Sequence, residues 1–152
     1  MSPGRIQGKV AAAKAGWVRA MLEGVRALPL RERESFAADA RNLAAAESYL
    51  RRALEALLDL GRHVLAKGFG KAPSEYRQIA EELVLAGVLD ARLGETLARM
   101  AGYRNRMVHL YNEVGGEELR LICLERLDEV EEVLAALLDW IGANRDRVDE
   151  GL

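Results

Sequence analysis

Residues 36 to 67 read FAADARNLAAAESYLRRALEALLDLGRHVLAK, and this stretch decides the fold. It holds no proline and a single glycine, so little in it opposes a continuous helix. Its large aliphatic residues return at helical spacing, which places them on one face. The pattern predicts one long helix over 36–67, with a buried side formed by Leu43, Leu50, Leu54, Leu57, Leu58 and Val64.

Four more helices are expected on the same grounds, over residues 5–28, 75–87, 90–113 and 117–145. Short breaks rich in glycine or proline separate them, and Ser74 and Asp90 are placed to cap the third and fourth helices. The fold class predicted is therefore all-α, an antiparallel up-and-down bundle of about five helices. With 152 residues, the chain forms a single domain over 1–152.

Composition narrows the class of protein. Half of the residues are apolar and 30% are charged, which is typical of a helical globular protein. No apolar run approaches the roughly 20 residues of a membrane span, and the first residues lack a secretory signal, so we expect a cytoplasmic protein without a membrane partner. Cys123 is the only cysteine, which excludes an intrachain disulfide and indicates a small buried hydrophobe.

Charge is unevenly distributed along the chain. The net charge is −2, but acidic residues gather in the last helix, whereas no Asp or Glu occurs from 96 to 112. That window holds Arg99, Arg104 and Arg106. A polyanion can therefore be held locally by a chain that is not basic overall.

The window contains RNRMVHLY, residues 104 to 111. On a helix, Tyr103 and Met107 fall on the core stripe, while Arg104, Asn105, Val108 and His109 lie on the opposite arc. Asn105 and His109 are four apart, so the amide is positioned to orient the imidazole. Two copies of this face meeting across a two-fold axis would bring arginines and histidines into one cleft.

These residue types suit RNA cleavage by the ribose 2′-hydroxyl. The reaction needs a base, an acid and positive charge near the phosphate oxygens. Histidine serves as acid or base near neutral pH, and arginine matches phosphate geometry. We expect no cofactor and no metal, because two histidines without a local carboxylate make a poor metal shell.

The motif also resembles a known family. The signature of the HepT-like toxins of the HEPN ribonuclease superfamily is an arginine, four residues, a histidine, one residue and a tyrosine. This sequence resembles it at Arg104, His109 and Tyr111, with polar Asn105 directly after the arginine. The resemblance covers PSEYRQIAEELVLAGVLDARLGETLARMAGYRNRMVHLYNEV, residues 73 to 114, while the first and last helices match in pattern and length.

The resemblance implies a metal-independent endoribonuclease, the toxin of a toxin–antitoxin pair, with Arg104 and His109 as the catalytic pair and Asn105 in support. It implies a homodimer whose motif helices line the interface cleft, with RNA and not DNA as substrate. It also implies a minimal nucleotidyltransferase antitoxin as partner, which in some members transfers AMP to the motif tyrosine, here Tyr111. The acidic last helix departs from this pattern, and RNA binding would be weak if that helix borders the cleft.

Other interpretations stay open. The chain could be a non-catalytic binding subunit that partners a minimal nucleotidyltransferase, or a purely structural helical dimer. Arg104 could pair with an acid on another helix, and Tyr111 could pack. Arg106 is expected to be solvated or salt-bridged, and His63 to cap the end of its helix. The tryptophans, Trp17 and Trp140, are interpreted as core or interface anchors.

Overall fold

The computed structural model describes residues 4–109 and 114–151. This part of the chain forms seven α-helices, one short 3₁₀ helix and a two-stranded sheet. In chain order the elements are β1 (Ile6–Gln7), α1 (Gly8–Arg26), α2 (Arg33–Ala38), α3 (Ala40–Phe69), α4 (Tyr76–Leu85), α5 (Ala91–His109), α6 (Gly116–Glu125), α7 (Leu127–Ala143), η1 (Arg145–Arg147) and β2 (Val148–Asp149).

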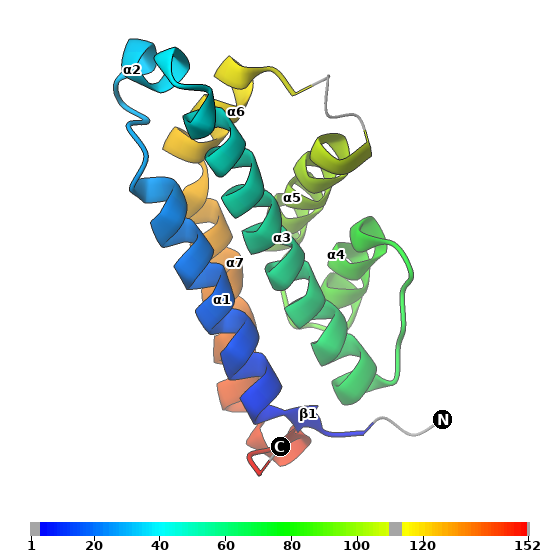
Figure 1. The fold of residues 1–152 in the computed structure, drawn as a ribbon. Coiled ribbons are helices and arrows are strands. Elements are labelled where there is room, and N and C mark those ends of the chain that lie inside the picture. Colours follow the sequence, from blue (N-terminus) through cyan, green and yellow to red (C-terminus); the bar gives the residue numbers. More distant parts are fainter. Residues whose placement is uncertain (1–3, 110–113, 152) are drawn as a thin grey trace.

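The long helix α3 is the centre of the fold. It contacts every other α-helix in the described ranges, with α1 along one side, α4 and α5 on the other and α7 behind (Figure 1). Because α3 has neighbours on several sides, most of its aliphatic residues are fully buried, among them Leu50, Leu54, Leu57, Leu58 and Leu60. The predicted all-α class is confirmed.

The helix predicted over 36–67 is two helices. Asp39 has an extended backbone (φ −121°, ψ 109°) and separates α2 from α3. Its carboxylate accepts a hydrogen bond from the backbone N–H of Arg41 at 3.0 Å, as an N-terminal cap does. Leu43 follows this break and is 38% exposed, so its assignment to the buried side is wrong.

The helix predicted over 117–145 is also divided. Arg126, with φ −114° and ψ 0°, separates α6 from α7, and the chain then passes through η1 into β2. Cys123 lies on α6 and is 1% exposed, which confirms the buried position. Burial raises the pKa of its thiol to about 12.

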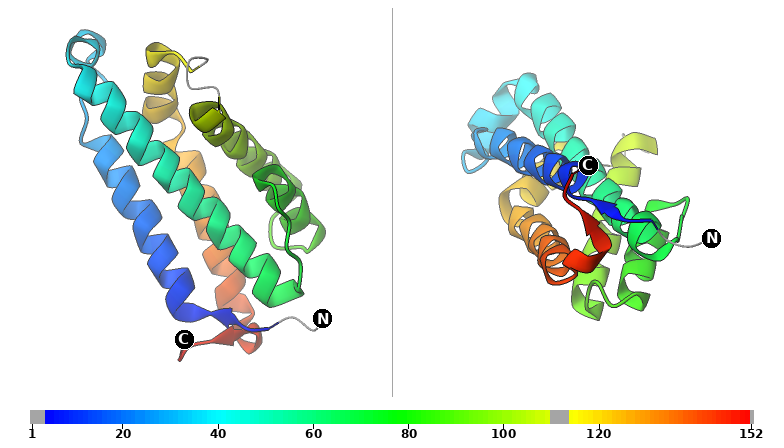
Figure 2. Two further views of the ribbon diagram at one scale, coloured as in Figure 1. Left: turned by 45° about the vertical axis from the view of Figure 1, so that its right-hand side comes forward. Right: turned by 90° about the horizontal axis from the view of Figure 1, so that it is seen from below.

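The two chain ends meet in a small sheet at the base of the bundle (Figure 2). Ile6 and Val148 are paired in parallel register, so the first helix begins at Gly8 and not at residue 5. His63 accepts a hydrogen bond at Nε2 from the backbone N–H of Gln7 at 3.0 Å. His63 thus ties α3 to β1, and its predicted role as a C-terminal cap is wrong.

The two tryptophans have different surroundings. Trp140 packs against Phe69, with ring centroids 5.4 Å apart, and lies at the edge of the core. Trp17 is 48% exposed on α1, so it is not a core residue. Within the described residues, none of the helices combines the length and apolar character that crossing a membrane requires.

The placement of α4 depends on a close approach to α3. A Cβ atom at Gly61 would lie 2.9 Å from Leu83 Cδ1 and 3.1 Å from Ile79 Cγ2, so a larger residue there would require these buried side chains, or α4 itself, to shift. Glu75, and not the predicted Ser74, is the N-cap of α4, in a capping box with Gln78. Asp90 caps α5 as predicted, because its Oδ1 accepts from the N–H of Leu93 at 2.8 Å.

Candidate active site

The second half of α5 carries the motif. Met107 is buried (5% exposed), Arg104 and Asn105 are half-buried, and Val108 is 37% exposed. The division into a core face and an outer face is therefore the one that the spacing predicts. His109 is the last residue of α5. Its side chain and the whole of Tyr111 lie outside the described residues.

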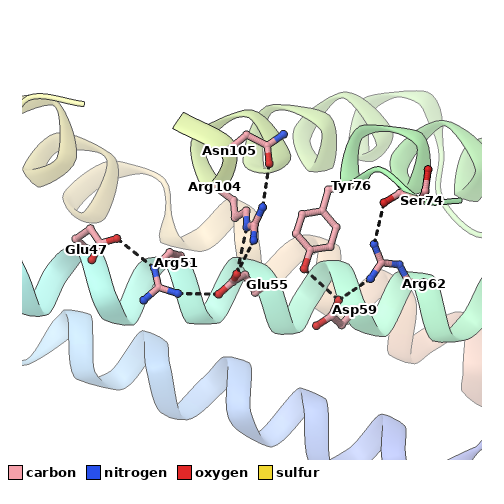
Figure 3. A network of polar contacts seen from close by, with 9 residues as sticks. All are labelled: Glu47, Arg51, Glu55, Asp59, Arg62, Ser74, Tyr76, Arg104 and Asn105. Atoms are coloured by element: carbon pink, nitrogen blue, oxygen red, sulfur yellow. Dashed lines mark hydrogen bonds and ion pairs between the residues drawn. The ribbon is translucent and has the colours of Figure 1, made fainter. Parts of the chain in front are cut away.

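Arg104 points toward α3, where it meets a carboxylate (Figure 3). Its Nε and Nη2 donate to Glu55 Oε2 at 3.2 and 2.9 Å. The Arg104 side chain is 19% exposed and that of Glu55 25%, so the pair is partly desolvated. The acid on another helix that the sequence left open as a partner is present, and it occupies two donors of the motif arginine.

The neighbours of Arg104 on α5 also have partners. Asn105 Oδ1 accepts from Arg104 Nη1 at 3.2 Å, so in this structure the amide orients the arginine. The expected contact between Asn105 and the imidazole of His109 falls outside the described side chains. Arg106 forms an ion pair with Glu118 of α6 at 2.6 Å, as predicted for a salt-bridged charge.

Tyr76, the first residue of α4, belongs to the site although the sequence did not single it out. The Cζ atoms of Arg104 and Arg62 lie 4.8 and 5.0 Å from the centroid of its ring, which is cation–π distance. Its hydroxyl donates to Asp59 Oδ1 at 3.2 Å. Burial, with the negative charge of Asp59 next in importance, raises the pKa of Tyr76, so the hydroxyl stays protonated.

A line of polar residues on α3 supports these contacts. Arg51 donates to Glu47 and to Glu55 at 3.2 and 3.0 Å, and Figure 3 shows this chain of ion pairs running into Arg104. One turn further along α3, the carboxylate of Asp59 accepts hydrogen bonds from the Tyr76 hydroxyl and from Arg62 Nη1. The spacing of 51, 55, 59 and 62 in an otherwise leucine-rich helix was a usable sequence signal for a polar stripe.

The motif residues line a groove of about 870 Å³ between α5 and the start of α4. Arginines from three helices converge there, whereas Glu75 is the single acid among the lining residues. Such a surface can hold an anion with several phosphate groups. The main lining residues are Arg62, Tyr76, Arg77, Arg104, Asn105 and Arg106.

A metal centre was not predicted. Over residues 4–109 and 114–151 no three His, Cys, Asp or Glu side chains are grouped so that they could hold a metal ion. What the groove offers is guanidinium donors, of which those of Arg62, Arg104 and Arg106 also pair with acids.

Comparison with known proteins finds a matching family and a relative that are both named for ribonucleases. A sequence model of the family "Ribonuclease HepT-like" matches residues 21–137. A protein of Archaeoglobus fulgidus named "Putative RNase" is 31% identical over 97 residues, which covers 64% of this chain and 67% of that protein.

Solved structures share the fold. The tri-AMPylated HEPN toxin of Shewanella oneidensis, in complex with its MNT antitoxin, superposes with a TM-score of 0.77 at 18% identity, over 86% of this chain and 97% of the toxin. A toxin–antitoxin structure with AMP-PNP gives a TM-score of 0.75 at 19% identity, over 84% of this chain and 97% of that one.

Proposed function

This chain belongs to the HepT-like ribonuclease family, and from that membership we propose that it is a metal-independent endoribonuclease that cuts RNA with Arg104 and His109. One observation carries the proposal. Arg104 lies in an arginine-lined groove beside Asn105, on the helix that ends at His109. A guanidinium group held at a groove wall is the group that a phosphodiester requires.

In the proposed reaction the ribose 2′-oxygen attacks the adjacent phosphorus, and the bond from phosphorus to the 5′-oxygen breaks. One proton leaves the 2′-hydroxyl and another reaches the departing 5′-oxygen, and His109 takes part in these transfers as acid or base. Arg104 stabilises the charge that develops on the non-bridging oxygens. Asn105 acts as a positioning residue through its contact with Arg104. DNA lacks the attacking hydroxyl and is no substrate.

We further propose a homodimer that joins the two motif faces. The support is an exposed apolar residue: Val108, which shares the outer face of α5 with Arg104 and Asn105, is 37% exposed. A large apolar side chain exposed on that face favours a self-complementary contact between two copies. Light scattering on the wild type and on Val108→Asp tests this, since the charge should shift the dimer toward monomer.

The proposed partner is a minimal nucleotidyltransferase that acts as antitoxin. The structurally similar Shewanella oneidensis toxin carries AMP groups and is bound to its MNT antitoxin, which supports the proposal. In the proposed regulation the hydroxyl of Tyr111 attacks the α-phosphate of ATP, pyrophosphate leaves, and the added AMP blocks RNA access. Mass spectrometry after co-expression identifies the modified residue.

A second candidate is a binding subunit without turnover. The observation in its favour is the ion pair between Arg104 and Glu55, which leaves the motif arginine already engaged by an acid. Under this candidate the protein binds its nucleotidyltransferase but cleaves no RNA, even when Tyr111 is unmodified.

The deciding experiment incubates unmodified protein with RNA in excess chelator. We expect cleavage that ends in 2′,3′-cyclic phosphate and is lost in His109→Ala and Arg104→Ala. Arg99→Ala is the matched control, because Arg99 lies on the same helix and its ion pair is with Glu129, away from the groove. Cleavage that requires a metal, or that survives His109→Ala, contradicts the proposal.

A further inference from the structure

The groove extends beyond the motif, to arginines that the cleavage chemistry does not use. Arg62 comes from α3 and Arg77 from the first turn of α4, and both line the same groove as Arg104. In Figure 3, Arg62 and Arg104 lie on opposite sides of the Tyr76 ring. A row of guanidinium groups therefore leads away from the motif along the start of α4.

Arg62 and Arg77 have weaker or fewer ion pairs and hydrogen bonds within the protein than the arginines of the motif helix have. Arg104 and Arg106 form ion pairs at 2.9 and 2.6 Å. Arg62 makes long contacts, 3.4 Å to Asp59 and 3.5 Å to the carbonyl of Ser74, and its buried Nε has no hydrogen-bond partner. Arg77 is exposed, and within the described residues it forms no ion pair. The buried Nε is out of reach of a ligand, so the available donors on this side of the groove are those of Arg77 and the weakly held Nη groups of Arg62.

Tyr76 limits the distance between the guanidinium groups of Arg62 and Arg104. The Cζ atoms of Arg62 and Arg104 are each within 5.0 Å of its ring centroid, so they cannot be farther apart than twice that distance. Neighbouring phosphates of one RNA strand fall within this separation. The hydrogen bond from the Tyr76 hydroxyl to Asp59 anchors the ring between the two guanidinium groups.

Local backbone geometry adds to the positive potential. The groove includes the N-terminus of α4, a helix of 10 residues whose dipole favours negative charge at that end. Glu75 opposes this, but its place in the capping box with Gln78 directs its carboxylate to the helix backbone. Of the arginines that line the groove, Arg62, Arg104 and Arg106 already pair with Asp59, Glu55 and Glu118. Arg77 forms no ion pair with a described residue, so it supplies the uncompensated positive charge at this end.

We propose that Arg62, Tyr76 and Arg77 form a subsite that binds a phosphate of the RNA strand next to the scissile one. This rests on the proposed function, because it assumes that Arg104 holds the scissile phosphate. In the subsite Arg62 and Arg77 donate to the phosphate oxygens, and Tyr76 positions Arg62. The contact is to the backbone, so it adds affinity and register without base specificity.

The test measures binding of a single-stranded RNA oligomer, made uncleavable by 2′-O-methyl groups, over a range of salt concentrations. Arg77→Ala should weaken binding about 3- to 10-fold and reduce the slope of log K against log salt by about 1, as loss of one phosphate contact does. Arg62→Gln should act in the same direction. Circular dichroism confirms that each variant is folded.

Arg19→Ala is the matched control. Arg19 is also an exposed helical arginine without an ion pair to a described residue, but it does not line the groove. Wild-type affinity and salt slope in both groove variants overturn the subsite, as does an equal loss in Arg19→Ala. Loss of nucleotidyltransferase binding with RNA binding intact also overturns it, since the groove would then hold a protein.

The subsite and the proposed function fail separately. If the variants weaken binding as expected but the wild type does not cleave RNA that lacks the 2′-O-methyl groups, the phosphate contact of Arg62 and Arg77 stands, with no scissile phosphate beside it, and the nuclease proposal falls. If the wild type cleaves RNA but the variants bind it normally, the nuclease stands and the subsite falls.

Discussion

Arg104 of α5 and Glu55 of α3, 49 positions apart in the chain, share two hydrogen bonds of 2.9 and 3.2 Å through a single carboxylate oxygen. Glu55 is itself held by Arg51. The carboxylate fixes the guanidinium at the groove wall and also competes with any phosphate for it. An RNA strand that engages Arg104 must therefore share or displace Glu55.

Glu55→Gln should tighten binding of uncleavable RNA about 3- to 10-fold, because a neutral amide competes less with phosphate than a carboxylate does. The same change should lower the free energy of unfolding by about 1 kcal/mol, since a partly buried charge-assisted contact is weakened. Fluorescence anisotropy and urea denaturation measure the two effects. Glu47→Gln is the control, because Glu47 contacts Arg51 and not Arg104. Weaker RNA binding in Glu55→Gln would mean that the carboxylate only positions Arg104.

Stability should fall as the solution is acidified, through His63. Burial lowers the pKa of His63, with the nearby charges of Lys67 and Lys14 adding to the effect. The unfolded chain thus binds the proton more tightly than the folded one. The stabilisation of the fold by neutral His63 is therefore complete above the unfolded pKa of about 6.5. It is lost as the pH falls through that value toward the lower folded pKa. Protonation at Nε2 would also remove the acceptor for Gln7.

Urea denaturation at pH 7.5 and at 5.5 measures this. His63→Gln removes the titrating group, so the difference between the two pH values should be smaller in the variant than in the wild type. An equal difference in both proteins would assign the acid sensitivity to other groups.

Two helical glycines should respond in opposite ways to alanine. Gly16 of α1 has no atom within 4 Å of an added Cβ, so Gly16→Ala should stabilise the fold by about 0.5–1 kcal/mol through helix propensity. Gly61→Ala should destabilise it by about 1–2 kcal/mol net, because the added Cβ would lie 2.9 Å from Leu83 Cδ1 and the buried Leu83 and Ile79 side chains would have to repack. Thermal denaturation compares them. Stabilisation by both changes would refute the close approach of α3 and α4.

The thiol of Cys123 should be inert in the folded protein. It is 1% exposed, and burial raises its pKa to about 12, so almost no thiolate forms at pH 8. A thiol reagent such as DTNB should react within minutes in denaturant and far more slowly without it. Rapid reaction of the native protein would show that α6 opens readily.

Much of the fold could be predicted because its causes are local. The leucine spacing in α3, the glycine and proline breaks and the cap at Asp90 are properties of short segments, and the structure confirms them. The predictions failed where two local signals competed. Asp39 interrupts a strong helical pattern because its carboxylate caps the following helix, and Arg126 divides a continuous apolar stripe.

For the candidate site, the sequence alone determined that Arg104 and Asn105 lie on the outer face of one helix, because helical geometry fixes which residues share a face. Only the tertiary structure decided what that face meets. Arg104 contacts Glu55 of α3 and the ring of Tyr76 of α4, and Tyr76 in turn contacts Asp59 and Arg62 of α3. These contacts form because α4 and α5 pack at one position along the axis of α3, at a height that brings the side chains level. That height depends on contacts across the whole core, such as Gly61 against Leu83, and no short segment of the chain encodes it.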